Sequence, residues 1–282
     1  MTTGYLIEKY NNMGTAYTCA RLLEEAKVIG MSLDIVGIHD TIIRESVLEN
    51  CGKILEPRDF VINRYKWGHI KDAINNLAQK SYNRIECYRP YIDKYVQLHN
   101  LDSQHFDKPK YILGTAQSNF EQLISLLGMP FIAKGLDSSM GREIRLIKNA
   151  SELSSLAKEF SPEKEFLFEE FITSSYGRDL RLFSIRGEAV ACMIRESKTD
   201  FRANVALGAN VKNYPINSEL QSIATDIYEV TGLDVLGIDL LFGRESLYFC
   251  EINVMPGLEG IEYASGINIA RLALRRIKED FN

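Results

Sequence analysis

Residues 235–253 read VLGIDLLFGRESLYFCEIN and predict a β-hairpin that carries acidic side chains on otherwise apolar strands. The polar exceptions in its two arms are Asp239, Glu251 and Asn253. If a three-residue loop at 244–246 joins the arms, Asp239 lies directly opposite Glu251, with the Cβ atoms roughly 4.5–5.5 Å apart. Asn253 then shares their face, two residues further along the second strand. The pattern therefore predicts a cluster of oxygen-bearing side chains at one place on a sheet.

Two acids that face each other across a sheet repel. Like charges in direct opposition are destabilising unless a cation or basic groups lie between them. Two carboxylates and a carboxamide supply only hard oxygen ligands, which favours magnesium, or manganese, over zinc. The alternative is a solvated polar strand face that tolerates the repulsion. The metal hypothesis depends on the register, because a slip of one residue would separate the two acids.

A lysine and a small-residue loop are candidates for binding phosphate. Lys134 ends an apolar strand, and the loop after it contains Ser138, Ser139 and Gly141. Loop amides can surround a phosphate, and a lysine adds a point charge. The loop lacks the GKS or GKT of a Walker A sequence, and its single glycine is weak support. A surface lysine followed by an ordinary turn is therefore the alternative interpretation.

Hydrophobic periodicity gives a coarse outline of the chain. Strands alternate with helices over about the first 90 residues, which predicts a small α/β domain with a parallel sheet. Ser118 and Glu121 form a capping box that begins a helix, and Gly128 ends it. Longer strands follow from Leu180 onward, and helices are expected over 218–230 and 268–280.

The composition of the chain argues against several classes of protein. Its 282 residues include 33 Lys and Arg and 38 Asp and Glu, and the net charge of −5 argues against nucleic-acid binding by bulk electrostatics. No apolar run approaches the roughly 18 residues of a membrane span, and no secretory signal is recognisable. The five cysteines include no CxxC pair, which is typical of reduced thiols, and Cys192 and Cys250 are expected in the core. We therefore expect a cytoplasmic protein that binds neither nucleic acid nor membrane.

Several of these segments resemble the ATP-grasp carboxylate–amine ligases and, within them, the RimK-type group. That group includes the glutamate ligase that acts on the tail of a ribosomal protein and the LysX-type ligases of amino-group carrier proteins. The matching segments run in the family's order from about Asp93 to the carboxyl end: EFI at 170–172, GRDLR at 177–181, DFRAN at 200–204, GID at 237–239 and EINVMPGLEGIE at 251–262. The last run, E-x-N-x-x-P-G-x-E-G, is highly specific, whereas the amino-terminal domain matches only in its α/β pattern.

The resemblance implies an α/β protein with the α+β ATP-grasp fold, organised in three parts. A small amino-terminal parallel α/β domain would span 1–92. Two α+β subdomains, 93–173 and 174–282, would follow and clamp ATP between them, with the metal site in the second.

The resemblance also implies roles for individual residues. Lys94 and Lys134 match the two lysines that hold the ATP phosphates. The magnesium ligands match Asp239, Glu251 and Asn253, in agreement with the hairpin argument. The remaining matches are the flexible loop over the phosphates at Ser138, Ser139 and Gly141, the adenine hinge at Glu170, Phe171 and Ile172, a ribose-side contact at Asp179, and positions near the phosphates at Arg202 and Asn204. The loop departs from the family, whose extra glycines are replaced here by Ser, Met and Glu143.

The implied reaction is an ATP-dependent amide ligation with Mg²⁺, or Mn²⁺, as the metal. The γ-phosphoryl group passes to a substrate carboxylate, and an amine attacks the acyl phosphate to give an amide, ADP and phosphate. The implied partners are ATP, an amino acid such as glutamate, and an amine on a small molecule, a peptide or a protein tail. The catalytic candidates are Arg195 and Arg202. Arg195 could stabilise the acyl phosphate and its tetrahedral adduct, and a surface arginine at a strand end is the equal alternative.

The identity of the substrates is left open by the sequence. RimK-type sequences usually follow the Arg-x-Asn position with a His-Arg-Gly-Gly-like run, whereas Asn204 is followed by VALGAN at 205–210, so the amine acceptor could differ. Arg64 and Arg89 are candidates for binding the substrate carboxylate, with surface charges as the alternative. Alternative functions are a kinase on the same fold and a non-catalytic nucleotide-binding scaffold. Among the partners, a second copy of the chain in a homo-oligomer is also left open.

Overall fold

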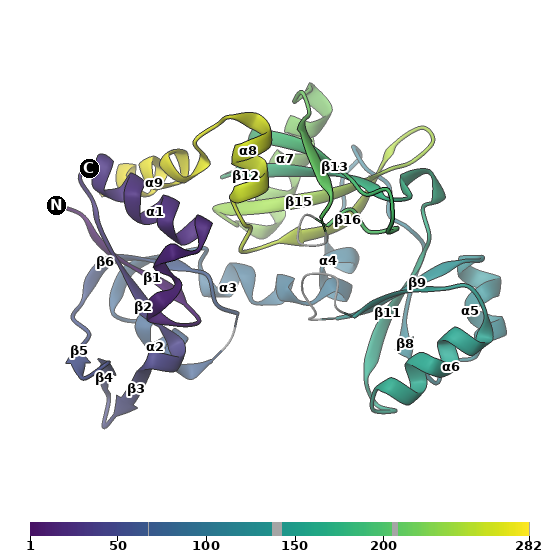
Figure 1. Ribbon diagram of the computed structural model, residues 1–282, viewed down its shortest axis with the longest axis horizontal. Coiled ribbons are helices and arrows are strands. Elements are labelled where there is room, and N and C mark those ends of the chain that lie inside the picture. The colour runs from purple at the N-terminus through teal and green to yellow at the C-terminus, as the bar shows by residue number, and fades with distance from the viewer. Residues whose placement is uncertain (67, 137–142, 205–207, 282) are drawn as a thin grey trace.

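A parallel sheet with the strand order β2-β1-β6-β7 forms the amino-terminal part of the computed structural model (Figure 1). The structure describes residues 1–66, 68–136, 143–204 and 208–281. The strands are β1 (Thr3–Glu8), β2 (Ser32–Gly37), β6 (Arg58–Asn63) and β7 (Ala78–Tyr82), connected in part by the helices α1 (Tyr17–Val28) and α2 (His69–Asn75). A short antiparallel meander, β3 (Thr41–Arg44), β4 (Val47–Asn50) and β5 (Lys53–Ile54), lies between β2 and β6 in the chain. The predicted parallel α/β arrangement is therefore confirmed.

A second sheet lies at the opposite end of the molecule and is antiparallel (Figure 1). Its order is β10-β9-β11-β8, with β8 (Tyr111–Thr115), β9 (Phe131–Gly135), β10 (Ile144–Ile147) and β11 (Glu165–Glu170). The helices α5 (Phe120–Leu127) and α6 (Ala150–Glu159) pack their leucines against the phenylalanines of β9 and β11. Two short helices, α3 (Ile85–Tyr88) and α4 (Lys94–Asn100), lead from the first sheet to this one.

The helix α5 begins one residue later than the capping-box pattern predicts. Asn119 is its N-cap, because Asn119 Oδ1 accepts a hydrogen bond from Gln122 N at 2.9 Å. Ser118 instead accepts a hydrogen bond from Thr115 N at 3.1 Å and closes the turn after β8. The predicted capping box at Ser118 and Glu121 is therefore wrong. Serine and asparagine are equally good N-caps, but the Ser118 hydroxyl is already engaged in the turn after β8.

The third sheet has the order β14-β13-β12-β15-β16 and contains the hairpin on which the sequence prediction rests. Its strands are β12 (Arg178–Ile185), β13 (Glu188–Glu196), β14 (Asn210–Asn213), β15 (Val235–Phe242) and β16 (Leu247–Asn253). The helix α7 (Ser218–Thr231) packs on one face, and α8 (Glu259–Ser265) and α9 (Ile269–Glu279) pack on the other. Among all described residues, no helix is long and apolar enough to cross a bilayer.

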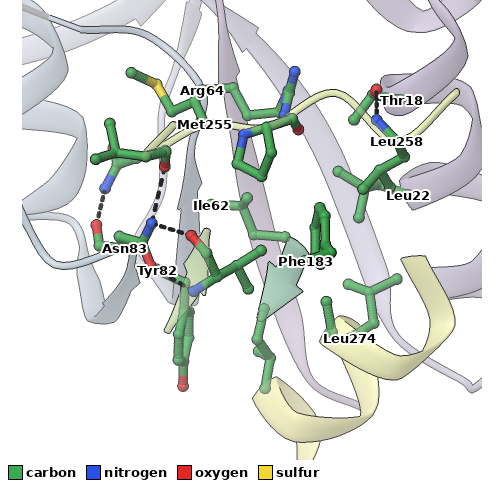
Figure 2. Close-up of a pocket in the computed structure, with 16 residues that line it drawn as sticks. Thr18, Leu22, Ile62, Arg64, Tyr82, Asn83, Phe183, Met255, Leu258 and Leu274 are labelled. Carbon is green, nitrogen blue, oxygen red and sulfur yellow. Dashed lines mark hydrogen bonds between the residues drawn. The ribbon is translucent and has the colours of Figure 1, made fainter. Parts of the chain in front are cut away.

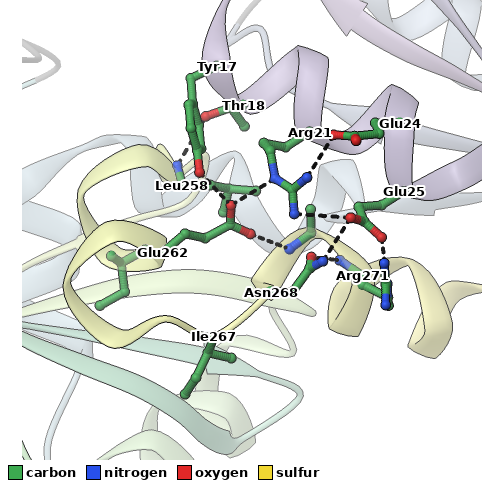
Figure 3. A network of polar contacts seen from close by, with 12 residues as sticks. Tyr17, Thr18, Arg21, Glu24, Glu25, Leu258, Glu262, Ile267, Asn268 and Arg271 are labelled. Atoms are coloured by element: carbon green, nitrogen blue, oxygen red, sulfur yellow. Dashed lines mark hydrogen bonds and ion pairs between the residues drawn. The ribbon is translucent and has the colours of Figure 1, made fainter. Parts of the chain in front are cut away.

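Ionic contacts join α1 of the amino-terminal domain to α8 and α9 (Figure 3). The Glu25 carboxylate, which is almost fully buried, accepts hydrogen bonds from Arg271 and from Asn268 and also pairs with Arg21. The Glu262 carboxylate accepts hydrogen bonds from Tyr17 at 2.9 Å, Arg21 at 3.1 Å and the backbone N–H of Ala270 at 3.0 Å. The first domain is therefore fixed to the segment that directly follows the E-x-N-x-x-P-G-x-E-G run.

We predict that Glu25→Gln lowers the free energy of unfolding by about 1–2 kcal/mol, because a neutral amide cannot accept the same charge-assisted hydrogen bonds from Arg271 and Arg21. The matched control is Glu24→Gln, since Glu24 is exposed and pairs only with Arg21 among the described ion pairs, and it should change stability by less than about 0.5 kcal/mol. Denaturant unfolding of the three proteins measures the difference. Equal stabilities of the two variants would contradict the prediction.

The same variant should alter the acid dependence of stability. Burial raises the pKa of Glu25, but the hydrogen bonds from Arg271 and Asn268 outweigh it and hold the pKa below its usual value. The stabilisation is therefore present above the pKa of the unfolded state and is lost as the pH falls through the lower pKa of the folded state. Glu25→Gln should lose this part of the pH dependence.

Candidate active site

The hairpin β15–β16 places Asp239 opposite Glu251, as the sequence predicts, but by a different connection. At the turn, Phe242 pairs with Leu247, and Gly243 N donates to Ser246 O at 2.9 Å, so the loop is one residue longer than expected. A bulge after Asp239 then adds one residue to β16 and restores the predicted register. Gly237 pairs with Asn253, which puts the three oxygen-bearing side chains on one face.

The bulge overturns the prediction that Cys250 belongs to the core. Because the extra residue interrupts the alternation of side chains, Phe249 is fully buried in the core and Cys250 leaves it. The Cys250 Sγ instead lies 3.9 Å from the Nζ atom of Lys134. Burial raises the pKa of this thiol to about 12, so it stays protonated at neutral pH.

Two arginines surround the carboxylate of Asp239. Arg181, opposite Asp239 on β12, donates to it through Nε and through Nη2, the latter at 2.7 Å. Arg195 on β13 donates to the same carboxylate from Nη2 at 2.8 Å. Burial raises the pKa of Asp239, but the two guanidinium groups outweigh it and lower the pKa to about 2. Asp239 is therefore ionised, as a metal ligand must be.

Arg195 is 5 % exposed, which excludes the alternative of a surface arginine. Its Nε and Nη2 atoms donate to the Asp179 carboxylate at 2.6 and 2.8 Å, in addition to the bond with Asp239. Asp179 and Arg195 face each other across β12 and β13, so the register brings them together. The Asp179 carboxylate thus holds Arg195, and its contact with a ribose stays a prediction.

The two predicted phosphate lysines are both buried and both paired with acids. Lys94, in the first turn of α4, has its Nζ atom 3.6 Å from Glu251 Oε2. Lys134, on β9, has its Nζ atom 2.7 Å from Glu169 Oε2. Burial alone would lower the pKa of Lys134, but the paired Glu169 carboxylate raises it, so the ammonium group stays charged. The structure therefore brings Lys94, Lys134 and Glu251 to the edge where the second and third sheets meet.

Glu169 and Arg181 are the residues of this site to which the sequence assigned no role. Glu169 precedes the predicted hinge, and Arg181 ends the GRDLR segment. The ion pairs of this site form a network whose formal charges sum to zero. Its acids are Asp179, Asp239, Glu169 and Glu251, and its bases are Lys94, Lys134, Arg181 and Arg195. A buried set of this kind needs such pairing, since an unpaired buried charge is costly.

The predicted hinge and the segment with Arg202 lie side by side. The Phe171 ring is edge-on to the Phe201 ring, with the centroids 6.2 Å apart, and Ile172 is buried. Glu170 contacts Lys110, and Arg202 pairs with Asp200 at 2.7 Å. Asn204 accepts a backbone hydrogen bond from Ala209. The loop residues Ser138, Ser139 and Gly141 lie outside the described residues, so their role stays a prediction.

The residues present fit a nucleotide and a hard cation. Glu169 Oε1 is buried and has no hydrogen-bond partner among the described residues, so it can accept a hydrogen bond from a ligand such as an amino-substituted base. No set of three His, Cys, Asp or Glu side chains converges as a metal site in the described chain. Two carboxylates and one carboxamide suit Mg²⁺, which usually completes its shell with water and phosphate oxygens.

The residues proposed for the substrate carboxylate are already engaged within the protein. Arg64 donates to Glu8 at 2.7 Å and to the backbone oxygen of Pro256 at 3.1 Å, beside the segment that follows Asn253 (Figure 2). Arg89 pairs with Asp72 on the surface. The cavity drawn in Figure 2 has a volume of about 60 Å³ and a mostly apolar lining. It is therefore too small for a nucleotide, because ligand pockets usually span about 300–1,000 Å³.

Comparisons with known proteins agree with this geometry. A family model described as a RimK-like ATP-grasp domain matches residues 92–277. A relative named "Probable alpha-L-glutamate ligase" from Histophilus somni (strain 129Pt) is 28 % identical over 94 % of this chain and 95 % of its own length. A relative of the same name from Haemophilus ducreyi (strain 35000HP / ATCC 700724) is 31 % identical over 92 % of this chain and 93 % of its own length.

Solved structures with little sequence identity show the same fold. The ATP-grasp ligase PsnB, in complex with a minimal precursor, has a TM-score of 0.73 at 15 % identity and covers 98 % of this chain and 99 % of its own. A D-alanine–D-alanine ligase from Bacillus anthracis has a TM-score of 0.71 at 14 % identity, with 99 % and 96 % covered. These likenesses support an α+β ATP-grasp fold for the chain.

The pairing of Lys134 with Glu169 yields a stability prediction. Lys134→Met leaves a fully buried carboxylate without its cation and should lower the free energy of unfolding by about 3–5 kcal/mol. The double variant Lys134→Met/Glu169→Gln should recover most of this loss, because the uncompensated charge is gone. A double-mutant cycle by denaturant unfolding measures the coupling. Losses that simply add would show that the two side chains do not form the pair.

Proposed function

Since this chain belongs to the RimK-like ATP-grasp family, we propose that it joins the carboxylate of an amino acid, glutamate first among the candidates, to an amine of a peptide or small molecule. The family and the relatives identify the chain as an ATP-dependent ligase. Glutamate is favoured because the similar proteins are named as probable α-L-glutamate ligases. A peptide acceptor is favoured because a RiPP-associated ATP-grasp ligase from Chryseobacterium gregarium, which shares the fold, is complexed with a leader and core peptide.

The observation that carries the proposal is the convergence of Asp239 and Glu251, in register on adjacent strands, with two buried lysines. ATP would lie between the subdomains 93–173 and 174–282, where Lys94 and Lys134 provide charge for its phosphates. Asp239, Glu251 and Asn253 would hold Mg²⁺, with Mn²⁺ as an alternative, and Asn253 Oδ1 is oriented by a hydrogen bond from Met255 N at 3.1 Å. When bound, the metal neutralises charge on the phosphate oxygens.

The proposed chemistry proceeds in two displacements. A carboxylate oxygen of the amino acid attacks the γ-phosphorus of ATP, the bond to ADP breaks, and an acyl phosphate forms. The amine of the acceptor then attacks the acyl carbon, an amide bond forms, and phosphate leaves with the former carboxylate oxygen while the amine loses a proton. Positioning and charge stabilisation provide most of the catalysis in such transfers.

The arginines have separate proposed roles. Arg195 carries a positive charge beside Asp239, where it can stabilise charge that develops on the acyl phosphate and its tetrahedral adduct. Arg202, adjacent to the hinge through Phe201, would contact the phosphates, and Asn204 would lie near it. The hinge residues 170–172 would receive adenine, and the VALGAN run at 205–210 would alter the choice of acceptor relative to the named ligases.

A substrate panel tests the proposed reaction. ADP release is measured with the full-length protein, MgATP, each amino acid and a set of peptide and small-molecule amines, and the products are weighed by mass spectrometry. We expect ADP and an amide of the summed mass minus water for at least one pair, with glutamate among the active acids. If ATP binds and no pair stimulates ADP release, the ligase proposal fails. If ADP forms together with a phosphorylated acceptor and no amide, the protein is a kinase.

Glu251→Gln should reduce ligase turnover by at least about 100-fold, because a neutral amide replaces a carboxylate metal ligand. The control Glu245→Gln changes an exposed acid in the loop of the same hairpin and should leave turnover unchanged. Initial rates of ADP formation at saturating substrates measure both variants. Wild-type turnover in Glu251→Gln would contradict the metal-ligand assignment.

A further inference from the structure

The strand that carries Glu251 and Asn253 lies at the edge of its sheet. In the order β14-β13-β12-β15-β16, β16 comes last among the described strands. An edge strand presents backbone N–H and C=O groups that its own sheet does not satisfy. Near the turn, Asp107 meets this edge, since Phe249 N donates to Asp107 O at 2.8 Å and Asp107 N donates to Leu247 O at 2.8 Å.

Closer to the metal ligands, a glutamine side chain takes the place of a neighbouring strand. Ile252, between Glu251 and Asn253, donates its N–H to Gln97 Oε1 at 2.8 Å. Gln97 Nε2 in turn donates to the backbone oxygen of Ile252 at 3.1 Å and to that of Tyr91 at 2.6 Å. Gln97 is 4 % exposed, so these bonds do not compete with solvent. One carboxamide thus satisfies both backbone groups of the residue between two proposed ligands.

An asparagine contacts the chain two residues further along, where it links the backbone oxygen of Val254 to the backbone of Val235. Asn83 Nδ2 donates to the backbone oxygen of Val254 at 2.9 Å and to that of Val235 at 2.7 Å (Figure 2). Its Oδ1 accepts the N–H of Val235 at 2.8 Å. Asn83 is itself held by Asn63, whose Nδ2 donates to the Asn83 backbone oxygen at 2.9 Å. The amino-terminal sheet is therefore connected through Asn83 to the residue after Asn253.

We propose that Gln97 and Asn83 are positioning residues that set the geometry of the metal ligands Glu251 and Asn253. By fixing the backbone at residues 252 and 254, they fix the direction in which the side chains of 251 and 253 leave the strand. Mg²⁺ demands near-ideal octahedral geometry, so small displacements of its oxygen ligands weaken binding. The proposal rests on the metal site of the proposed function.

Gln97 also connects the metal ligands to a phosphate lysine. Lys94 lies one turn before Gln97 on α4, and its Nζ atom is 3.6 Å from Glu251. The same short helix therefore places a cation beside Glu251 and hydrogen-bonds to the backbone of the next residue, Ile252. Relative movement of α4 and β16 would change the distance between the phosphate-binding charge and the metal.

A second glutamine, Gln221, provides the control that separates positioning of the metal ligands from a purely structural role of Gln97. Gln221 also pairs its carboxamide with backbone: Ala189 N donates to Oε1 at 3.1 Å, and Nε2 donates to Gly187 O at 2.8 Å. This pairing lies at the turn between β12 and β13, at the other end of these strands from Asp179 and Arg195. Gln221→Met thus removes the same kind of contact without touching the ligand strand.

The test compares Mn²⁺ binding by full-length wild type, Gln97→Met and Gln221→Met in the presence of ADP, followed by the electron paramagnetic resonance of free Mn²⁺. Methionine keeps the side-chain length and removes the hydrogen bonds. We expect the Kd for Mn²⁺ to rise about 10-fold in Gln97→Met and to stay at the wild-type value in Gln221→Met. The midpoint of thermal unfolding is recorded for both variants. Similar midpoints show that stability alone does not account for the difference in Kd.

An unchanged Kd in Gln97→Met would overturn the proposal. If Gln97→Met does not fold, Asn83→Ser is used in its place, with the same rise expected and the same unchanged Kd as the contradicting result. If the wild type itself binds no Mn²⁺ with ADP, the metal site of the proposed function fails, and the positioning roles fail with it. A rise in Gln97→Met together with absent ligase turnover in the wild type would leave the positioning roles supported and the proposed reaction refuted.

Discussion

The direct opposition of Asp239 and Glu251 on adjacent strands is the constraint on which the rest of the site depends. Two carboxylates at this spacing repel, and the repulsion must be offset by cations. The chain supplies these cations from separate elements, because Arg181 and Arg195 come from β12 and β13 and Lys94 comes from α4. The protein is therefore organised so that strongly charged groups meet where its sheets converge, although the net charge of −5 gives no sign of them.

This electrostatic balance suits a site for a polyanion and a divalent cation. Each buried acid of the network has a basic partner, and Lys134 pairs with Glu169 on the second sheet in the same way. A bound phosphate would attract Lys94 and Lys134, which now face Glu251 and Glu169. Asp239, Glu251 and Asn253 are the residues that would hold the metal. Exchanging one set of pairs for the other keeps buried charges compensated in both states, which a site with unmatched charge could not do.

The sequence predicted the main elements of the site because they follow from local pattern. The alternation within residues 235–253 identified Asp239, Glu251 and Asn253, although two deviations from the assumed hairpin, a longer loop and a bulge, cancelled each other. The same bulge made the prediction for Cys250 wrong. Arg181 and Glu169 escaped prediction because their partners lie on strands far away in sequence. The meander formed by β3–β5 was not predicted, because its strands are only two to four residues long and show too little alternation.

The proposed reaction passes through an acyl phosphate, formed from ATP and an amino-acid carboxylate. It is tested most directly by following the oxygen atoms of the substrate. Glutamate labelled with ¹⁸O in its carboxylates is incubated with the protein, MgATP and an active amine, and the released phosphate is analysed by mass spectrometry. We expect each phosphate released to carry one ¹⁸O atom from the carboxylate that becomes the amide. Phosphate free of ¹⁸O, formed in step with the amide, would contradict it.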